Sequence, residues 1–599
     1  MADAHVERGT AYGRLETPTM AVTIDMEEGL HAPAMPTAAA ADETWDMAAP
    51  LAKFTVDDAT SMDWDYSNVS KEEAKPRASR KSLLASLRSG SEFGGDTEKE
   101  TKEELGVLLD PYYDVTTGRL RRMFHHFSPH GKDTVSYDEF QKGLLALGIS
   151  GPSNMSFHDF VRKVDTNNDK AISLDEFVHC VQMIKQAHLF KPEHLVKVDE
   201  HVLRVVDYSP TAIHIVAPVT KLQRFMFSAK PTWASVRWVH LAGLSKQDDV
   251  NLRRLAIKYQ LHPLAVEDCL NQNDKIRCKY EHYEDHSFLA IPVLRPLSHE
   301  KRDLIDACID DHRRAMFAKK RSLALQGDKA STAPIVAGNR AAKIAALEAK
   351  LDGLNGMLSE PEQLCIFVTK GNDQVLSVQA DSDAANVSAF ALWDAIFDHN
   401  MAKSYSKLRN HGASFLVMSI LNAVVDEMLP LVEVFDAKLK MLGKLLRLER
   451  TKFDTKRFAR AKKQLIAIEK TVRPLLALVE DQLLDRDEFN KGEVKNYLRD
   501  VKDHVKEMVG DLKDHQHVLA ALAEEDKQIR AQHQTDILYT VSVVAALFLP
   551  GTFMTGVYGM NFENIPELHT DYGYFVWWGV LGAIEILLLG YIKLYKKWI

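Results

Sequence analysis

The sequence predicts an α/β soluble domain followed by long stalk helices and two C-terminal transmembrane helices, with a separate all-α pair of helix–loop–helix units ahead of the α/β domain. Three observations support this organisation. Two apolar runs lie near the end of the chain, at 537–558 and 574–591. Helical spacing of Ala, Leu, Lys and Glu fills 383–534, with very few glycines. Short β-branched runs alternate with helical segments between 195 and 382, which is typical of an α/β domain.

The first apolar run, Ile537–Tyr558, has no charged residue and is long enough to cross a hydrocarbon layer of ~30 Å. The second run, Tyr574–Tyr591, is apolar except for Glu585. An ionisable group inside a span is costly, so we expect Glu585 to be protonated or hydrogen-bonded against the first span. A buried core helix is the alternative for one such run, but two runs separated by a polar loop favour two spans.

Charge predicts the orientation of the two spans. The loop between them carries three acids and no Lys or Arg; the acids are Glu563, Glu567 and Asp571. The last residues carry Lys593, Lys596 and Lys597. Because positive residues favour the cytoplasmic side, we expect both termini in the cytoplasm and the acidic loop outside. The plasma membrane is the expected location, and an organelle membrane is the alternative.

The segment that joins the spans resembles a known family. Tyr558-Gly559-Met560-Asn561-Phe562 is followed by Pro566-Glu567-Leu568 and by a terminal Lys596-Lys597-Trp598, and this arrangement resembles the CorA magnesium channel family. Trp238-Val-His-Leu and the run that begins at His262-Pro-Leu also resemble the CorA cytosolic domain. The resemblance implies a homopentamer in the lipid bilayer, with a cytosolic α/β domain, stalk helices and two spans per subunit.

The resemblance also implies a selectivity filter at Gly559, Met560 and Asn561. Mg²⁺ holds its waters tightly, so a ring of neutral Asn561 carboxamides can hydrogen-bond the hydrated ion without stripping it. The outer-loop acids would concentrate cations at this mouth. Counting back along the first span, the positions that match the family's pore lining are Thr535, Leu538, Val541, Leu549 and Thr552. The three apolar ones would form a hydrophobic gate, whereas ordinary packing against lipid is the alternative for each residue taken singly.

Acidic residues at subunit interfaces bind regulatory Mg²⁺ in this family. The matching positions are Asp268, with its neighbour Glu267, and Asp500. A third family acid falls on Asn422, which puts a second ion at this interface in doubt. Ordinary solvated or ion-paired acids remain the alternative.

The helix–loop–helix pair at 106–190 contains a candidate Ca²⁺ loop. Oxygen donors recur at the spacing of an EF-hand, with a bidentate-capable glutamate at position 12; the ligand positions are Asp165, Asn167, Asp169, the backbone of Ala171, Ser173 and Glu176. Position 6 is Lys170 rather than glycine, so we expect a strained positive φ and a weakened site. The first loop, Ser128–Glu139, lacks suitable ligands and should only pair through Ile172, and a structural remnant without Ca²⁺ is the alternative for the whole pair.

The remaining segments complete the organisation. Residues 1–105 show no sustained period and should be disordered. The α/β domain should occupy 191–382 with an insertion at about 297–360, the stalk 383–536, and the membrane region 537–599 with an outer loop at 559–573. We expect helix breaks near 449–453 and 485–492. From 493 through 558 the helical pattern contains only Pro550 and three glycines, Gly510, Gly551 and Gly556, so one rod of ~100 Å is expected, with two or three kinked helices as the alternative.

Composition narrows the class of protein. The chain has 599 residues, a formal net charge of −9 and 27% charged residues. Five cysteines without a C-x-x-C pair favour a reducing compartment. No signal peptide is visible, and no P-loop motif is present, so we expect neither a nucleotide nor a nucleic acid as partner. The 24 histidines occur in no catalytic frame, so we do not expect an enzyme.

These features together predict a homopentameric channel for Mg²⁺ influx driven by the membrane potential and gated by intracellular divalent ions, with Ca²⁺ binding to the EF-hand as a further input. Two alternatives stay open. One is a Zn²⁺, Co²⁺ or Ni²⁺ transporter of the same family. The other is a non-conducting, membrane-anchored Ca²⁺ sensor.

Overall fold

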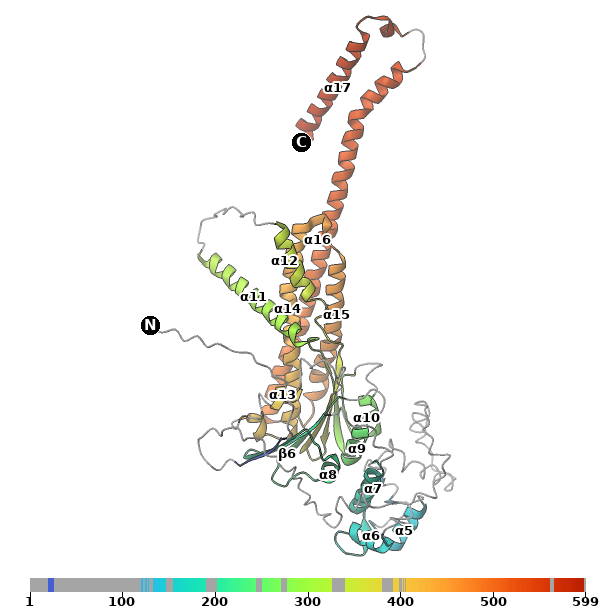
Figure 1. Ribbon diagram of the computed structural model, residues 1–599, viewed down its shortest axis with the longest axis vertical. Helices are drawn as coiled ribbons and strands as arrows, with labels where there is room; N and C mark the ends of the chain where they lie inside the picture. Colours follow the sequence, from blue (N-terminus) through green and yellow to red (C-terminus); the bar gives the residue numbers. More distant parts are fainter. Residues whose placement is uncertain are drawn as a thin grey trace, which may run out of the picture. The chain divides into compact units, whose positions relative to one another are not determined.

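The computed structural model describes residues 20–25, 120–121, 124–125, 128, 133–146, 155–189, 202–243, 250–270, 277–325, 340–379, 392–397, 401, 403, 406–560 and 565–596 (Figure 1). The chain divides into two compact units. The first unit comprises 1–320, 356–434 and 466–512, and the second comprises 321–355, 435–465 and 513–599. Three long helices, α14, α15 and α16, each run through both units.

The first unit is built on one eight-stranded sheet with the order β1-β5-β4-β6-β10-β9-β8-β7. The strands are β1 (Met20–Asp25), β4 (Val202–Tyr208), β5 (Ala212–Ala217), β6 (Val236–Ala242), β7 (Lys279–His282), β8 (His286–Val293), β9 (Glu362–Thr369) and β10 (Gln374–Gln379). Neighbours run antiparallel except β10 and β6, which are parallel. The β-branched runs recognised in the sequence therefore form the predicted sheet.

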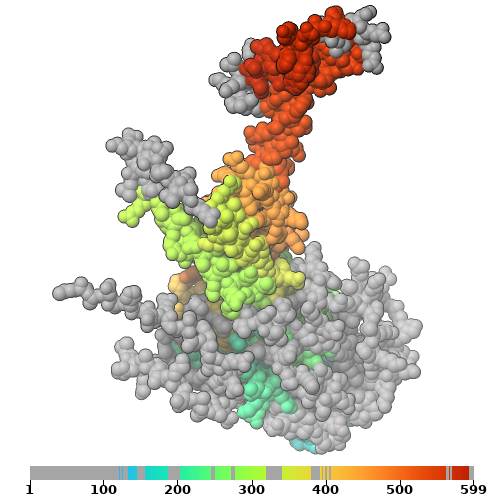
Figure 2. Space-filling model, turned by 45° about the horizontal axis from the view of Figure 1, so that its top comes forward, coloured from blue at the N-terminus to red at the C-terminus, as the bar shows by residue number. Residues whose placement is uncertain are grey.

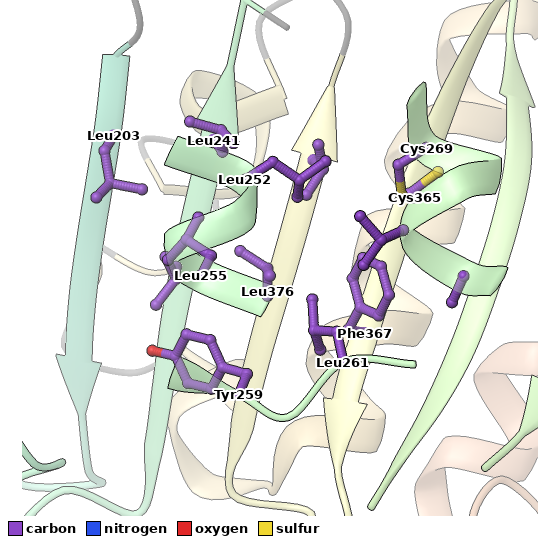
Figure 3. Close-up of a cluster of buried hydrophobic side chains, with 14 of the residues drawn as sticks. Leu203, Leu241, Leu252, Leu255, Tyr259, Leu261, Cys269, Cys365, Phe367 and Leu376 are labelled. Carbon is purple, nitrogen blue, oxygen red and sulfur yellow. The ribbon is translucent and has the colours of Figure 1, made fainter. Parts of the chain in front are cut away.

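Helices α8 (Leu222–Phe227), α9 (Val250–Lys258) and α10 (Pro263–Leu270) pack against this sheet. Leu252, Leu255 and Tyr259 follow helical spacing, so one side of α9 and the residue just beyond it face the strands. They share a core with Leu376 and Phe367, which Figure 3 draws beneath α9 and α10. The helices thus bury the apolar face of the central strands.

Strand β1 corrects the prediction of disorder for residues 1–105. Met20–Asp25 pairs antiparallel with β5, from Met20 opposite Ala217 to Asp25 opposite Ala212. The segment is short, but Val22 and Ile24 are β-branched and suit an edge strand. The rest of 1–105 lies outside the described residues.

The helix–loop–helix pair has its own small ribbon and core. Strands β2 (Thr134–Ser136) and β3 (Ala171–Ser173) pair antiparallel, with Val135 opposite Ile172. This confirms that Ile172 joins the two loops. The helices are α5 (Tyr137–Ala146), α6 (Phe157–Val164) and α7 (Leu174–Leu189), and their buried aromatic and aliphatic side chains form one cluster with Val135 and Ile172.

The long helices end close to where the sequence predicted. Helix α14 spans Ala413–Glu449 and gives way to a 3₁₀ turn at Arg450–Lys452; helix α15 spans Lys456–Ala477 and continues as a π-helical segment, η5 (Leu478–Leu483). Helix α16 then runs without interruption over Gly492–Tyr558, 67 residues, with Pro550 inside it. One helix of ~100 Å is therefore confirmed, and the kinked alternative is not.

The remaining elements are shorter. The insertion forms α11 (His299–Leu325) and α12 (Arg340–Gly353). In the first unit, the Arg313 guanidinium on α11 donates two hydrogen bonds, of 2.8 and 2.7 Å, to the Glu433 carboxylate on α14. Helix α13 (Leu392–Ile396) and a 3₁₀ turn, η3 (Lys407–Asn410), precede α14. After α16 come a 3₁₀ turn, η6 (Pro566–His569), and the last helix, α17 (Gly573–Lys596).

Candidate ion pathway and regulatory sites

Three described helices are long and apolar enough to cross a membrane, α14, α16 and α17. The three helices differ in how much of their apolar surface the rest of the chain covers. In the most apolar window of α14, 61% of residues are buried, against 0% in α16 and 6% in α17. Figure 2 shows the end of the chain in orange to red, where the side chains of α16 and α17 lie on the surface. The predicted spans are thus the two apolar helices that the chain itself leaves uncovered.

The predicted pore-lining residues share one face of α16. At ~100° per residue, Leu538, Val541, Leu549 and Thr552 lie within a sector of roughly 80°, and Thr535 extends that sector to about 120°. Leu538 is 68%, Val541 61% and Leu549 71% exposed. The hydroxyl groups of Thr535 and Thr552 donate to backbone carbonyls one turn earlier, at 3.0 and 2.8 Å. Their oxygens therefore keep lone pairs that can accept hydrogen bonds from water.

Helix α17 packs against a different side of α16. Leu581 is 6% exposed, and its side chain lies against Gly551, where an added Cβ would be 3.7 Å from Leu581 Cδ1. Gly551 is about 140° around α16 from the centre of the predicted pore face, at ~100° per residue. The half-buried residues on this side are Val543, Leu547, Pro550, Gly551 and Met554. The contact with α17 therefore leaves the predicted pore face free.

Glu585 lies one turn beyond Leu581 and is half-buried. Residues four apart share a helix face, so Glu585 lies on the side of α17 that meets α16. This placement agrees with the expectation that the acid faces the first span.

The described part of the predicted filter shows why glycine occupies position 559. The backbone N–H of Gly559 donates to the carbonyl of Thr555 at 2.9 Å, and an added Cβ would lie 2.9 Å from that same oxygen. A side chain there would force the helix end to shift. Met560 follows and is 49% exposed. Asn561 and Glu563 lie outside the described residues, Glu567 belongs to η6, and Asp571 is exposed.

The predicted regulatory acid Asp268 is already paired with cations of its own chain. It lies in α10, and its side chain is 6% exposed. Lys279 Nζ, on β7, lies 2.5 Å from one carboxylate oxygen, and the Arg277 guanidinium meets the other. Glu267 beside it is half-buried. The sequence did not reveal these two partners, because they come from a separate strand.

The second predicted regulatory acid, Asp500 on α16, is close to an acid that the sequence analysis missed. Partial burial raises the pKa of Asp426 on α14; the charge of His504 opposes this shift, and the charge of Asp500 adds to it. Asn422 Nδ2 donates to Asp426 Oδ2 at 2.7 Å. Asp426 follows Asn422 by one turn, so i, i+4 spacing on α14 was the signal that could have identified it.

The candidate Ca²⁺ loop holds its two end acids inward. Asp165 is fully buried; its Oδ1 accepts from the Asn168 N–H at 2.6 Å, and its Oδ2 accepts from the Lys170 N–H at 3.0 Å and from the Tyr137 hydroxyl at 2.6 Å. Lys170 has φ 63°, the strained conformation expected for a residue that replaces glycine. The loop therefore makes its turn despite the substitution.

Glu176, at the other end of the loop, is 5% exposed. Its two oxygens accept backbone N–H groups of Thr166 at 2.7 Å and of Ser173 at 2.9 Å. Burial alone would raise the pKa of Glu176, but these hydrogen bonds outweigh it and lower the pKa, which keeps the carboxylate ionised. Asn167 and Asp169 lie on the exposed side of the loop.

This donor set fits a hard cation such as Ca²⁺. Within the described part of the chain, however, no three His, Cys, Asp or Glu side chains converge as a metal-binding group. An ion would have to draw in the amide and backbone oxygens of the loop, at Asn167 and Ala171, together with its carboxylates.

Comparison with known proteins finds a family model that matches the C-terminal part of the chain. Residues 360–596 match the family model described as CorA-like Mg²⁺ transporter protein. The chain is similar to this family over that segment. The match begins next to β9 and continues to the end of α17, so it includes the three apolar helices and the segment predicted to form the filter.

Curated relatives are similar over different lengths. The cobalt/magnesium transport protein CorA of Thermotoga maritima is 24% identical over 376 residues, which cover 63% of this chain and 85% of that protein. The putative metal ion transporter YfjQ of Bacillus subtilis is 28% identical over 197 residues, which cover 31% of this chain and 58% of that protein. The complete structure of the CorA magnesium transporter from Methanocaldococcus jannaschii aligns with 67% of this chain and 99% of that one, at 12% identity and a TM-score of 0.46.

Proposed function

We propose that this CorA-like chain assembles as a homopentamer and conducts hydrated Mg²⁺ through a pore lined by α16. The observation that carries the proposal is the division of α16 into two sides. One side packs against α17 through Gly551 and Leu581, and the other presents the predicted pore residues, with Leu549 71% exposed. A ring of identical helices would place that second side around a central axis.

The chemistry of this face suits a hydrated cation. Three apolar side chains give a constriction that can empty of water and close, whereas two threonine oxygens offer acceptors to an ion's hydration shell. Beyond Gly559, a ring of Asn561 carboxamides would meet Mg²⁺ while it keeps its waters. The acids Glu563, Glu567 and Asp571 would raise the local cation concentration.

An inside-negative membrane supplies the driving force. One elementary charge gains about 2.3 kcal/mol per 100 mV, so a divalent ion gains about twice that. With both termini in the cytoplasm, as the terminal lysines favour, influx needs no nucleotide. The plasma membrane remains the expected site.

Regulation is proposed for two ions, Mg²⁺ and Ca²⁺. Intracellular Mg²⁺ would bind near Asp500, where Asp426 brings a second carboxylate; at Asp268, with Glu267 beside it, an ion would first have to displace Lys279. Ca²⁺ would bind the loop between Asp165 and Glu176 through Asn167, Asp169, Ala171 and Ser173. Both ions would act from the cytoplasmic side.

The test is ion flux into liposomes that contain the purified protein and a Mg²⁺ indicator. We expect influx that follows an imposed inside-negative potential, and we expect Asn561→Ala to abolish it while native mass spectrometry still shows five copies. Asn564→Ala, in the same loop, is the matched control and should conduct.

Two outcomes would overturn the proposal in favour of the alternatives. Flux of Zn²⁺, Co²⁺ or Ni²⁺ without Mg²⁺ would identify a different transporter of this family. Ca²⁺ binding without any ion flux would identify a membrane-anchored sensor.

A further inference from the structure

Helix α7, which leaves the candidate Ca²⁺ loop, is buried on more than one side. Phe177, Cys180, Val181 and Ile184 belong to the core of the helix–loop–helix pair. Further along, Lys185 is 5% and Gln186 3% exposed, although neither is part of that core. A polar residue so deeply buried on the far side of a helix indicates a second packing partner.

That partner is α9 of the α/β domain. Gln186 Nε2 donates to the Arg254 carbonyl at 2.7 Å, and Gln182 Nε2 donates to the Ile257 carbonyl at 3.2 Å. Gln182 and Gln186 are one turn apart, so they form a single stripe on α7. Their acceptors lie three residues apart and form a matching row on α9.

His179 of α7 also lies near enough to the end of α9 to feel the charge of Lys258. Burial lowers the pKa of His179 on α7 to about 4, and the charge of Lys258 on α9 contributes in the same direction. Lys258 Nζ in turn donates to the backbone carbonyls of Met226 and Ser228, at 3.1 and 2.5 Å. The end of α9 is thus hydrogen-bonded to α7 through the Ile257 carbonyl and to the end of α8 through Lys258.

Helix α9 is consequently a layer between two cores. Leu252 and Leu255 face the sheet, whereas Arg254, 1% exposed, and Ile257, 3% exposed, lie where α7 docks. A helix buried on both sides cannot change its position without disturbing both neighbours, because packed interiors are close-packed and transmit strain.

Beyond α9 the contacts continue toward α16. Helix α10 follows after four residues and carries Asp268, which pairs with Lys279 on β7. The next residue of β7, Tyr280, donates its N–H to Gln482 Oε1 at 3.0 Å and its hydroxyl to Glu488 Oε2 at 2.9 Å. Gln482 belongs to η5 and Glu488 lies between η5 and the start of α16 at Gly492, so every step lies inside the first unit.

We propose that α7 is the element through which ion occupancy of the Asp165–Glu176 loop acts on the α/β domain, by its glutamine contacts with α9. Glu176 lies in the first turn of α7, so an ion that pulls on its carboxylate reorients the helix that bears Gln182 and Gln186. This inference rests on the proposed Ca²⁺ site but not on conduction. Coupling of this kind is reciprocal, so the docking of α7 must in turn affect Ca²⁺ affinity.

The experiment is hydrogen–deuterium exchange of the full-length protein in detergent, with and without Ca²⁺, read in peptides that contain α9. In the wild type we expect Ca²⁺ to change the exchange rate of α9 amides by roughly fivefold or more, the lower end of couplings between sites. Gln182→Ala/Gln186→Ala should remove this response. Gln141→Ala, a glutamine of the same module on α5, is the matched control and should keep it.

The experiment distinguishes a misfolded variant, a failed coupling and a failed channel function from one another. If the double variant does not fold, Gln182→Ala alone serves, because that side chain is only half-buried. An α9 response that persists in the variants, or a wild type that binds Ca²⁺ by calorimetry without any response in α9, would overturn the inference. So would a wild type that binds no Ca²⁺. Mg²⁺ flux in liposomes decides the proposed function independently of all three results.

Discussion

Two pairs of adjacent acids in the first unit differ in how their charge is compensated. On α10, the Glu267–Asp268 pair has a buried member, Asp268, that meets Lys279 and Arg277. On α14, Glu427 is half-buried and meets Arg302, while Asp426 lies near Asp500. The resemblance to the family implied a regulatory ion near both regions.

This difference indicates at which of the two sites a bound divalent cation would gain the most electrostatic free energy. At Asp268, two positive charges of the chain already neutralise the carboxylate, so an ion must displace an ammonium group at 2.5 Å. At Asp426 and Asp500, like charges repel, and a divalent ion between them would relieve that repulsion. The α14–α16 region is therefore the stronger candidate for a Mg²⁺-dependent contact, and the α10 region is stabilised without an ion.

Lys279→Met is the substitution with the largest expected effect. It leaves Asp268 buried with only Arg277 as a partner, and breaking a buried ion pair costs roughly 3–5 kcal/mol, of which the lower end applies here. Thermal unfolding of the purified chain should show the loss. Lys440→Met, which removes an exposed partner of Asp436, is the control and should cost less than about 0.5 kcal/mol. Equal effects of the two changes would remove the distinction drawn for Asp268.

Glu427 should make the stability of the folded chain depend on pH. Burial raises the pKa of Glu427 from 4.5 to about 7, although the charge of Arg302 opposes the shift. The folded state therefore holds the proton more tightly, and the free energy of unfolding should fall as the pH rises from about 4.5 to 7, by about 2–3 kcal/mol at 1.36 kcal/mol per unit.

Glu427→Gln stays neutral throughout and should flatten this part of the stability profile, measured by denaturant unfolding across the pH range. Glu433→Gln, an exposed acid on the same helix, is the control and should leave the profile unchanged. A profile as steep in Glu427→Gln as in the wild type would contradict the assignment.

Much of this architecture followed from the sequence because it depends on local patterns. The continuity of α16 was predictable because the stretch from 493 to 549 has no proline and only one glycine, Gly510, and the ribbon at Ile172 from the spacing of the loop. Whether a helix is buried inside the protein was harder to predict from the sequence. Helix α14 is as apolar as a membrane span, with a mean hydropathy of 1.8, yet most of that window is covered by the chain itself. Composition alone does not tell a buried helix from one in lipid.

The partners of charged groups were the hardest to predict. Asp268 was identified, but the cations that neutralise it come from β7 and the residues just before that strand, and nothing in local spacing places them there. Asp426 was overlooked because the family comparison directed attention to Asn422, one turn away. Strand β1 was missed because its partner, β5, lies far along the chain.

Asp500→Asn tests directly which of the two regions binds Mg²⁺. If Mg²⁺ binds between Asp426 and Asp500, the Mg²⁺ concentration that half-maximally raises the melting temperature should increase about tenfold, which corresponds to 1.4 kcal/mol. Asp268→Asn should leave that concentration nearly unchanged, because its carboxylate is already paired. The reverse order of effects would transfer the regulatory ion to α10.

Asn422→Asp should produce the smallest change and in the opposite direction. A third carboxylate, one turn from Asp426, adds negative charge where Asn422 Nδ2 now donates a hydrogen bond. Without Mg²⁺, like charges at i, i+4 should cost about 0.2–0.5 kcal/mol. With Mg²⁺, the half-maximal concentration should fall a few-fold, because the ion gains a ligand. Asn490→Asp introduces the same charge at an exposed position outside this region, and a matching fall in that control would mean that net charge, rather than this group of side chains, sets the affinity.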